Sequence, residues 1–356
     1  MHIEIKDMWG GETLASWDEE SFSALTFTNE MPGGHITASF LVKCEYHLPY
    51  EWAQHFLQVD IWNGPTHCWG GYIMPLERYW ESAETGILVE CAGWVAKLQQ
   101  LMGQVNLSAE KGSTYITDHI LSDEEVSSWL TAGNIETTDY TIPGLREYKP
   151  WKTYAEILED INQFNGWRWY VRGKALHFEP YTEEVAYRGS VEFATGSARS
   201  DPTEFANRLR YDYTDTAGVR QTATLTDTDS PYPIKDAAYS LSGNMAAAQA
   251  QQAAQIMLDS LSFIGTTAPC EIWYCETPEG MSIPACEIWP GVGIRVDGFI
   301  PATASPAEAF QIDNDIDTYT IRAMTYDHES GRAALELGRQ SHSMPVILNR
   351  LAAMAK

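Results

Sequence analysis

The chain has 356 residues, of which 44% are hydrophobic and 12% are aromatic, and its mean hydropathy is −0.29. This length exceeds one compact core and the composition excludes long disorder, so we expect two to four folded units. Lys and Arg total 23 against 49 Asp and Glu, a formal net charge of −26, which excludes sequence-specific nucleic-acid binding because that function requires clustered positive charge.

The cysteines and the apolar segments predict a protein of a reducing, aqueous compartment. Six cysteines are scattered without a C-x-x-C pair, so we expect buried free thiols and no disulfides. No apolar run approaches the ~20 residues of a membrane-spanning helix, and the first residues lack the basic and apolar regions of an export signal. We therefore expect assembly in a reducing cytoplasm without a stable membrane anchor.

Residues 1–90 contain short apolar or alternating runs that are separated by Gly, Pro and Asn-Gly turns. This pattern predicts an antiparallel barrel or sandwich. Asn63 and Gly64 are typical of a tight hairpin turn. Apolar residues at helical spacing over 91–103 predict a helix, and we end the first domain, a barrel-like unit over 1–103, at that point.

The next segment, 104–185, is predicted to be a small α/β module. It is more polar, and helices are expected at 115–121 and near 123–130. Another helix then begins at Thr153 and Glu156, which have the spacing of a capping box. Its apolar residues recur at intervals of three and four and would form one helical face: Tyr154, Ile157, Leu158 and Ile161.

A hairpin rich in aromatic residues follows this helix. Trp167 and Trp169 alternate with Arg168 and Tyr170 in the first strand. Gly173 is suited to the turn, and the alternation resumes in the second strand. The whole segment is therefore predicted to form a helix, a strand, a tight turn and a second strand, which we call the helix–hairpin unit.

Strand patterns return over 186–340, which we predict to be a second barrel-like β domain with an inserted helix. A hairpin is expected around residues 216–218. The segment 244–263 is rich in Ala and Gln and predicts a long helix whose small residues permit close packing on a sheet. The last hairpin turn is expected at 329–332.

The C-terminal segment 341–356 is predicted to be a short helical tail. Ile347, Leu351 and Met354 have the spacing of one apolar helical face.

The segment AEILEDINQFNGWRWYVRGKALHFEP resembles a unit in the hub proteins at the tip of bacteriophage tails and in the baseplates of contractile tails. The shared pattern is a short helix ending in an Asn-Gly or Gly turn, an aromatic strand, and a second strand that closes on Phe-x-Pro. The later pieces NRLRYDYTD, PGVGIRVDGF and IRAMTYDHESGRAALELG are similar to the second barrel of that family. The resemblance thus covers about two thirds of the chain.

The resemblance implies an α+β, mainly β fold: two barrel-like antiparallel domains, a smaller α/β module between them and a C-terminal helix. It further implies a structural hub in the virion tail, a homotrimer of quasi-sixfold symmetry that joins the tail tube to fibre or spike proteins and lets DNA pass. An acidic lumen would keep the phosphate backbone from adhering to the wall, although solubility alone is the simpler reading of the charge.

The predicted partner-binding residues are large apolar side chains outside the ring. We expect the aromatic residues of the module to be exposed or half-buried and to anchor a neighbouring tail protein. These candidates, together with two apolar residues of the tail helix, are Trp167, Trp169, Tyr170, Ile347 and Leu351.

Catalytic, cofactor and metal motifs are not recognisable in the sequence. H-E-x-x-H, G-x-S-x-G, Walker and dinucleotide-binding patterns are missing, so we expect no enzyme activity and no cofactor. The segment 313–317 has acidic residues at the 1, 3, 5 spacing of a calcium loop. Thr318 and Met324, however, occupy the positions where that loop requires Gly and Glu, and we expect no metal there.

A carbohydrate-binding or glycan-cleaving β-protein is the alternative. Clustered aromatic residues would be its sugar-stacking platforms, although strand aromatics more often form a core or an interface. Besides the hairpin, the clusters are Trp62, Trp69 and Tyr72, and Tyr79 and Trp80.

Overall fold

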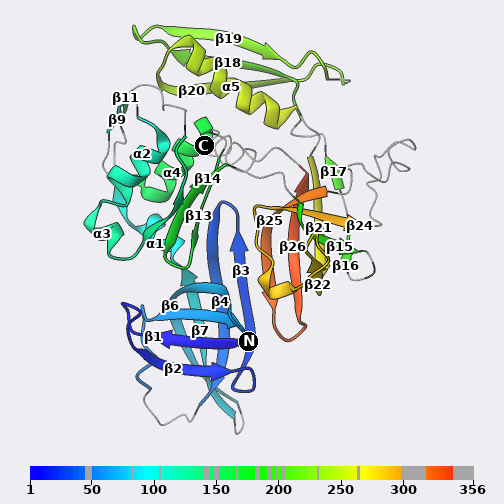
Figure 1. The fold of residues 1–356 in the computed structure, drawn as a ribbon. Helices are drawn as coiled ribbons and strands as arrows, with labels where there is room; N and C mark the ends of the chain where they lie inside the picture. The colour runs from blue at the N-terminus through cyan, green and yellow to red at the C-terminus, as the bar shows by residue number, and fades with distance from the viewer. Residues whose placement is uncertain are drawn as a thin grey trace.

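The computed structural model shows a mainly β protein in which 19 strands belong to one branched sheet, with a helical module and a smaller separate sheet beside it (Figure 1). The expected α+β, mainly β class is thereby confirmed. The structure describes residues 1–44, 50–81, 84–103, 106–108, 110–138, 145–147, 152–165, 167–180, 185–190, 192, 194–197, 199–201, 205–230, 232–262, 265–297 and 318–339.

The N-terminal strands form an antiparallel run in the order β2-β1-β5-β6-β7-β4-β3. The expected hairpin at Asn63 and Gly64 is confirmed, because Asn63 pairs with Thr66 and Gly64 has a φ of +54°. Strand β2 was not predicted. The strands are β1 (His2–Lys6), β2 (Thr13–Asp18), β3 (Phe22–Glu30), β4 (Gly33–Lys43), β5 (Gln58–Asn63), β6 (Thr66–Glu81) and β7 (Glu84–Gly93).

The C-terminal strands form the other half of the sheet. Strand β26 lies between β25 and β21. Strand β24 pairs with β25 on one edge and with β15 on the other. The expected last hairpin is confirmed by the pairing of Asp327 with Arg332. The elements are β15 (Val185–Ser190), β16 (Ala194–Gly196), β17 (Arg199–Asp201), β21 (Gly265–Ile272), β22 (Tyr274–Glu276), β23 (Ser282–Pro284), the 3₁₀ turn η2 (Ala285–Glu287), β24 (Gly293–Asp297), β25 (Thr318–Asp327) and β26 (Arg332–Arg339).

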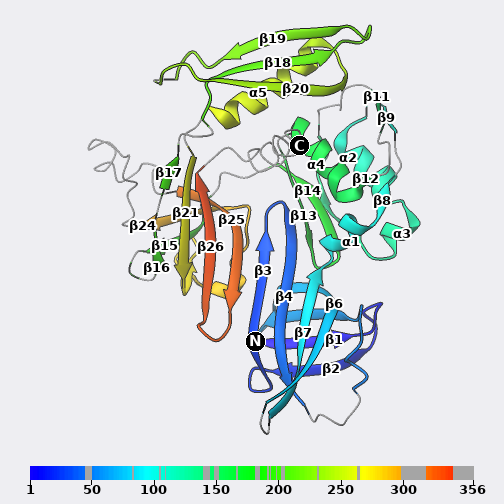
Figure 2. The ribbon, with the colours of Figure 1, turned by 180° about the vertical axis from the view of Figure 1, so that it is seen from behind.

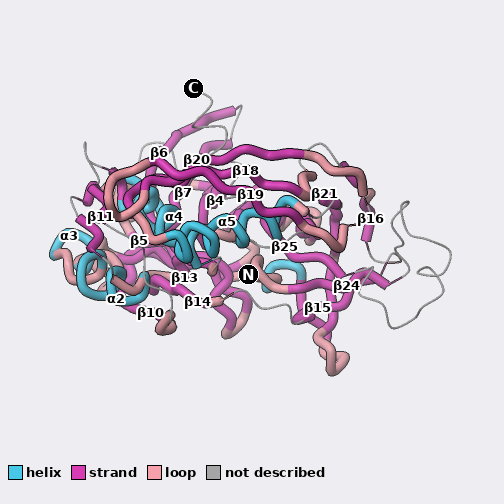
Figure 3. The backbone as a smooth tube through the Cα atoms, turned by 90° about the horizontal axis from the view of Figure 1, so that it is seen from above, coloured by secondary structure: helices cyan, strands magenta, loops and turns pink. Residues whose placement is uncertain are grey.

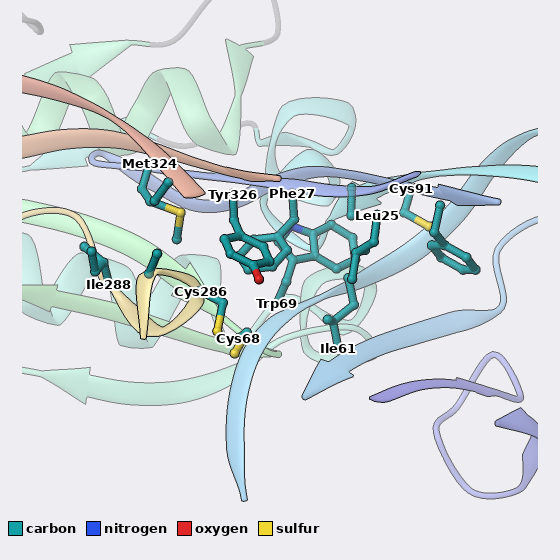
Figure 4. Packing of buried hydrophobic residues seen from close by; sticks show 14 of the residues in the cluster. Leu25, Phe27, Ile61, Cys68, Trp69, Cys91, Cys286, Ile288, Met324 and Tyr326 are labelled. Carbon is teal, nitrogen blue, oxygen red and sulfur yellow. The ribbon is translucent and has the colours of Figure 1, made fainter. Parts of the chain in front are cut away.

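Strands β3 and β25 join the two halves, although almost 300 residues separate them in the sequence. They pair antiparallel from Glu30 with Ala323 to Thr26 with Asp327. Side chains from both halves form one hydrophobic core beneath the pair, where the rings of Phe27 and Tyr326 lie 5.3 Å apart (Figure 4). The two halves are therefore packed as one body.

The helical module lies beside the N-terminal strands and is continuous with the main sheet through a parallel pairing of β13 with β4. The predicted helix over 91–103 is shorter than expected because residues 91–93 end strand β7. The elements are α1 (Val95–Gln100), β8 (Met102–Gly103), β9 (Asn106–Ser108), α2 (Gly112–Tyr115), the π-helical turn η1 (Ile116–Ile120), α3 (Glu124–Ser127), β10 (Thr131–Ile135), β11 (Leu145–Glu147), β12 (Lys152–Thr153), α4 (Tyr154–Asn165), β13 (Arg168–Arg172) and β14 (Ala175–Glu179).

A three-stranded sheet with one long helix forms the end of the molecule that is uppermost in Figures 1 and 2. The hairpin predicted around 216–218 is confirmed as β18 and β19, and Ala250 and Ala253 of the predicted long helix are buried, as expected. Seen from above, this helix crosses the centre of the molecule (Figure 3). The elements are β18 (Arg208–Thr214), β19 (Arg220–Thr226), the unpredicted β20 (Asp236–Asn244) and α5 (Ala247–Leu261).

The buried hydrophobic residues form two cores. One core is shared by the N-terminal strands and the C-terminal strands, and the other by the helical module, β18 and α5. Among the described strands no closed barrel is found, so the two-barrel division is not confirmed. The tail segment 341–356 lies outside the described residues. No described helix has the length and apolarity that a membrane crossing requires.

The cysteines agree with the expectation of free thiols. All six are unpaired by disulfides, and five are buried, whereas Cys44 is partly exposed. Cys68 of β6 and Cys286 of η2 lie next to each other in the shared core (Figure 4). Burial raises the pKa of the Cys91 and Cys275 thiols, which keeps these groups protonated and unreactive.

Candidate assembly surfaces

The helix–hairpin unit forms as predicted. The backbone N–H of Thr153 donates to Glu156 Oε2 at 2.8 Å, and the N–H of Glu156 donates to Thr153 Oγ1 at 3.2 Å, which completes the capping box. The predicted apolar face of the helix is buried in the core of the module: Tyr154, Ile157, Leu158 and Ile161. The Tyr154 hydroxyl donates to Asp123 Oδ2 at 2.7 Å and ties α4 to the start of α3.

The hairpin of this unit is held against the main sheet by a close backbone approach. Gly173 makes the β13–β14 turn with a φ of +57°. Val171 pairs with Gly34 of β4, where an added Cβ would lie 2.0 Å from the Val171 carbonyl oxygen. Gly34 also has a φ of +93°, so both its conformation and its contact require glycine.

The predicted exposure of the hairpin aromatics is wrong for two of the three residues. Trp169 is 3% exposed and lies in the core of the module, and Tyr170 is 8% exposed. Trp167 is half-buried and lies 5.1 Å from Phe178, measured between ring centroids. The two side chains point to opposite faces of β13, which pairs with β4 and β14, and both faces are covered. Trp169 packs in the core of the module, and Tyr170 lies against the rings of His177 and Trp289.

The partner-binding role of these residues remains a prediction, and of the three only Trp167 has the partial exposure that was expected. Ile347 and Leu351, the other two candidates, lie outside the described residues. Of the rings proposed as sugar platforms, Trp69 and Tyr72 are fully buried and Trp62 is half-buried. The side chains of Tyr79 and Trp80 lie outside the described residues.

Arg168 forms an ion pair within the hairpin and a hydrogen bond to the C-terminal half. Arg168 Nη2 lies 2.6 Å from Glu179 Oε1, and Arg168 Nη1 donates to the carbonyl of Gly291. Burial opposes ionisation of Glu179, but hydrogen bonds from Asn134 and Arg168 and the charge of Arg168 outweigh it and lower the pKa of this carboxyl. Glu179 therefore orients the Arg168 guanidinium, whose hydrogen bond to the Gly291 carbonyl holds the hairpin against the segment before β24.

A buried histidine lies where β4, β6 and the hairpin turn meet. The backbone N–H of Gly70 donates to His35 Nδ1 at 2.8 Å, and the N–H of Gly173 approaches the same atom at 3.4 Å. Burial, followed by the nearby charge of His67, holds the pKa of His35 well below its usual value. His35 is therefore neutral and accepts hydrogen bonds from both chain segments.

A polar, acidic groove of about 550 Å³ crosses the sheet on the face opposite the shared core. The strand register explains which side chains line the groove. Thr28 of β3 pairs with Thr325 of β25. Two residues further along, Ala323 of β25 lies between Glu30 of β3 and Glu336 of β26. Glu271 of β21 continues the surface. Burial, followed by the charge of Glu336, raises the pKa of Glu30. No Lys or Arg is among the described residues that line the groove.

Another surface feature was not anticipated from the sequence. Trp9 is 64% exposed and Phe56 is 44% exposed, and both belong to one aromatic cluster around Lys97. The only sequence signal was weak: Trp9 precedes a Gly-Gly turn between two strands, where an apolar ring has little chance of burial.

Metal ligation has no support within the described ranges, which hold no cluster of three or more His, Cys, Asp or Glu side chains placed to bind an ion. The acidic segment 313–317 lies outside those ranges. The groups described above take part in packing and in surface contacts of the fold.

Comparison with solved structures shows that this architecture is the fold of phage tail proteins, as the helix–hairpin pattern predicted. The 43 kDa tail protein of prophage MuSo2 from Shewanella oneidensis has a TM-score of 0.67 at 11% identity, over 97% of this chain and 100% of that one. A tail protein from Neisseria meningitidis MC58 has a TM-score of 0.66 at 10% identity, over 96% and 98%.

A third similar structure is the prophage tail protein gp18 from Listeria monocytogenes EGD-e, with a TM-score of 0.62 at 12% identity, over 99% of both chains. No protein-family pattern matches the sequence, and no curated protein matches it. At these identities the similarity establishes the fold alone.

Proposed function

We propose that this chain is a structural protein of a phage tail and acts as a hub at the tail tip or baseplate. The observation that carries the proposal is the end-to-end similarity to three tail proteins, which spans 96–99% of this chain and 98–100% of theirs. In this role the protein joins the end of the tail tube to a fibre or spike protein. Its place is the virion tail.

The same proposal includes a homotrimeric ring of quasi-sixfold symmetry. Support comes from the two β halves that β3 and β25 hold side by side in one sheet, since a chain that presents two such halves lets a threefold object meet a sixfold tube. The predicted division into units 1–103, 104–185, 186–340 and 341–356 belongs to this proposal.

DNA passage through the ring is supported by charge. The groove across β3, β25 and β26 carries Glu30, Glu271 and Glu336, and the chain as a whole carries −26. A channel wall of this kind repels the phosphate backbone, so that the genome does not adhere during ejection. We place this sheet face toward the channel.

The hub acts without catalysis or a cofactor in this proposal. Zymography on host cell wall should show no lysis by the purified chain. Clear lysis that a single Asp or Glu substitution abolishes would overturn this part.

Cryo-electron microscopy of the native particle tests the main proposal. We expect three copies at the end of the tail tube, with the groove facing the channel. Absence of the chain from the tail would overturn the structural role. Six copies or one would overturn the homotrimer alone, and a groove facing outward would overturn the channel assignment alone.

A further inference from the structure

The exposed aromatic cluster, which we call the Trp9 patch, consists of Trp9, Phe56 and Trp129 with Lys97 beneath them. Trp9 stacks on Trp129 with their ring centroids 5.3 Å apart, and Trp129 lies 5.7 Å from the buried Trp94. The patch is thus an exposed extension of the hydrophobic core of the module. It brings together the β1–β2 turn, the segment before β5 and the residue after α3, which are distant in the sequence.

Lys97 of α1 places a positive charge inside this patch. Its Nζ lies 4.1 Å from the ring centroid of Trp129, 4.5 Å from Tyr72 and 5.4 Å from Phe56. The residue is only 9% exposed, and burial lowers the pKa of its amine. Within the described part of the chain no carboxylate pairs with Lys97, so its charge is balanced only by the faces of the rings.

The backbone on both sides of the patch is held in place before any partner binds. Asp7 Oδ1 accepts the N–H groups of Trp9 at 3.0 Å and Gly11 at 2.8 Å, which orders the turn that carries the exposed ring. Phe56 has a φ of +67°, a strained conformation for a bulky residue, and its N–H donates to the carbonyl of Ile73. Such ordering lowers the entropic cost of binding.

An exposed tryptophan, an exposed phenylalanine and a nearly buried ammonium group without a carboxylate fit a partner surface that supplies a carboxylate surrounded by apolar atoms. A second copy of this chain offers carboxylates in excess, because its 49 acidic residues outnumber its 23 basic ones. We propose that the Trp9 patch is the contact by which one copy holds an acidic segment of the next copy. This inference rests on the proposed ring and names the surface that closes it.

Two substitutions in the purified full-length chain test the proposal. Trp9→Ala removes the exposed ring, and Lys97→Met removes the charge while keeping the stem. We expect each to raise the dissociation constant between copies by about tenfold or more, because a central aromatic or cationic anchor contributes at least that much to an interface. Sedimentation velocity and native mass spectrometry measure the association.

Trp273→Ala is the matched control, since Trp273 is 37% exposed on the C-terminal half and lies over the Arg332 guanidinium, away from the patch. It should change association by less than about twofold. Circular dichroism checks folding, and Trp9→Ala decides the outcome if Lys97→Met does not fold. If the wild-type chain associates and Trp9→Ala associates with the same affinity, this inference is wrong and the proposed ring is unaffected. A monomeric wild-type chain overturns both.

Discussion

The helix–hairpin unit and the Trp9 patch each contain two tryptophans, yet Trp169 of the unit and Trp9 of the patch have opposite environments. Trp169 is 3% exposed on an interior strand, whereas Trp9 is 64% exposed in a turn. Trp169, which belongs to the recognisable helix–hairpin motif, is therefore part of the core. Trp9, which belongs to no sequence motif, is accessible to a partner. Aromatic content alone does not distinguish a core from an interface; the position of the strand or turn in the sheet does.

The largest expected effect separates these two tryptophans. Trp169→Ala should lower the free energy of unfolding by about 3–5 kcal/mol, because it leaves a cavity in the core of the module. Trp9→Ala should change it by less than about 0.5 kcal/mol. Urea denaturation at pH 7 measures both. Equal effects of the two substitutions would show that the comparison is wrong.

A glycine substitution tests the junction that buries Trp169. Gly34→Ala should cost more than about 2 kcal/mol, since the added methyl group meets the Val171 carbonyl and the residue has a left-handed backbone. Gly218→Ala is the matched control, with a φ of +79° and no atom within 4 Å of the added Cβ, and should cost about 1–2 kcal/mol. Thermal unfolding of both variants gives the difference, and a Gly34 variant no less stable than its control would exclude a steric requirement.

The same junction should make stability depend on pH through His35. Its folded pKa is far below the unfolded value of about 6.5, so the unfolded chain binds the proton first and stability falls as pH drops below 6.5. Between pH 7.5 and 5.5 the loss from this residue should be about 1.4 kcal/mol. His35→Asn should lack that component. The test is to compare the unfolding curves of this variant with those of the wild type at both pH values. An equal loss of unfolding free energy in the two proteins would show that His35 is not its source.

The smallest effect concerns the acidic groove. Glu336→Gln removes the charge that raises the pKa of Glu30, so that pKa should fall toward its ordinary value while stability changes by less than about 0.5 kcal/mol. An NMR titration of the Glu30 carboxyl reports the shift. Asp229→Asn, on an exposed turn outside the groove, is the control and should leave that titration unchanged.

The sequence by itself determined the local elements. The capping box at Thr153 and Glu156, the Gly173 turn and the hairpins at 63–64, 216–218 and 329–332 were all predicted, because spacing and turn chemistry act over a few residues. The helix–hairpin pattern was also sufficient to indicate the fold of phage tail proteins.

Only the tertiary structure decided which surfaces are free. The pairing of β3 with β25 unites residues almost 300 positions apart, and the pairing of β13 with β4 joins the helix–hairpin unit to the main sheet. Local patterns carry no information about such distant partners, because a strand has the same alternation whether one or both of its edges are paired. For that reason the burial of Trp169 and the exposure of Trp9 both escaped prediction from the sequence.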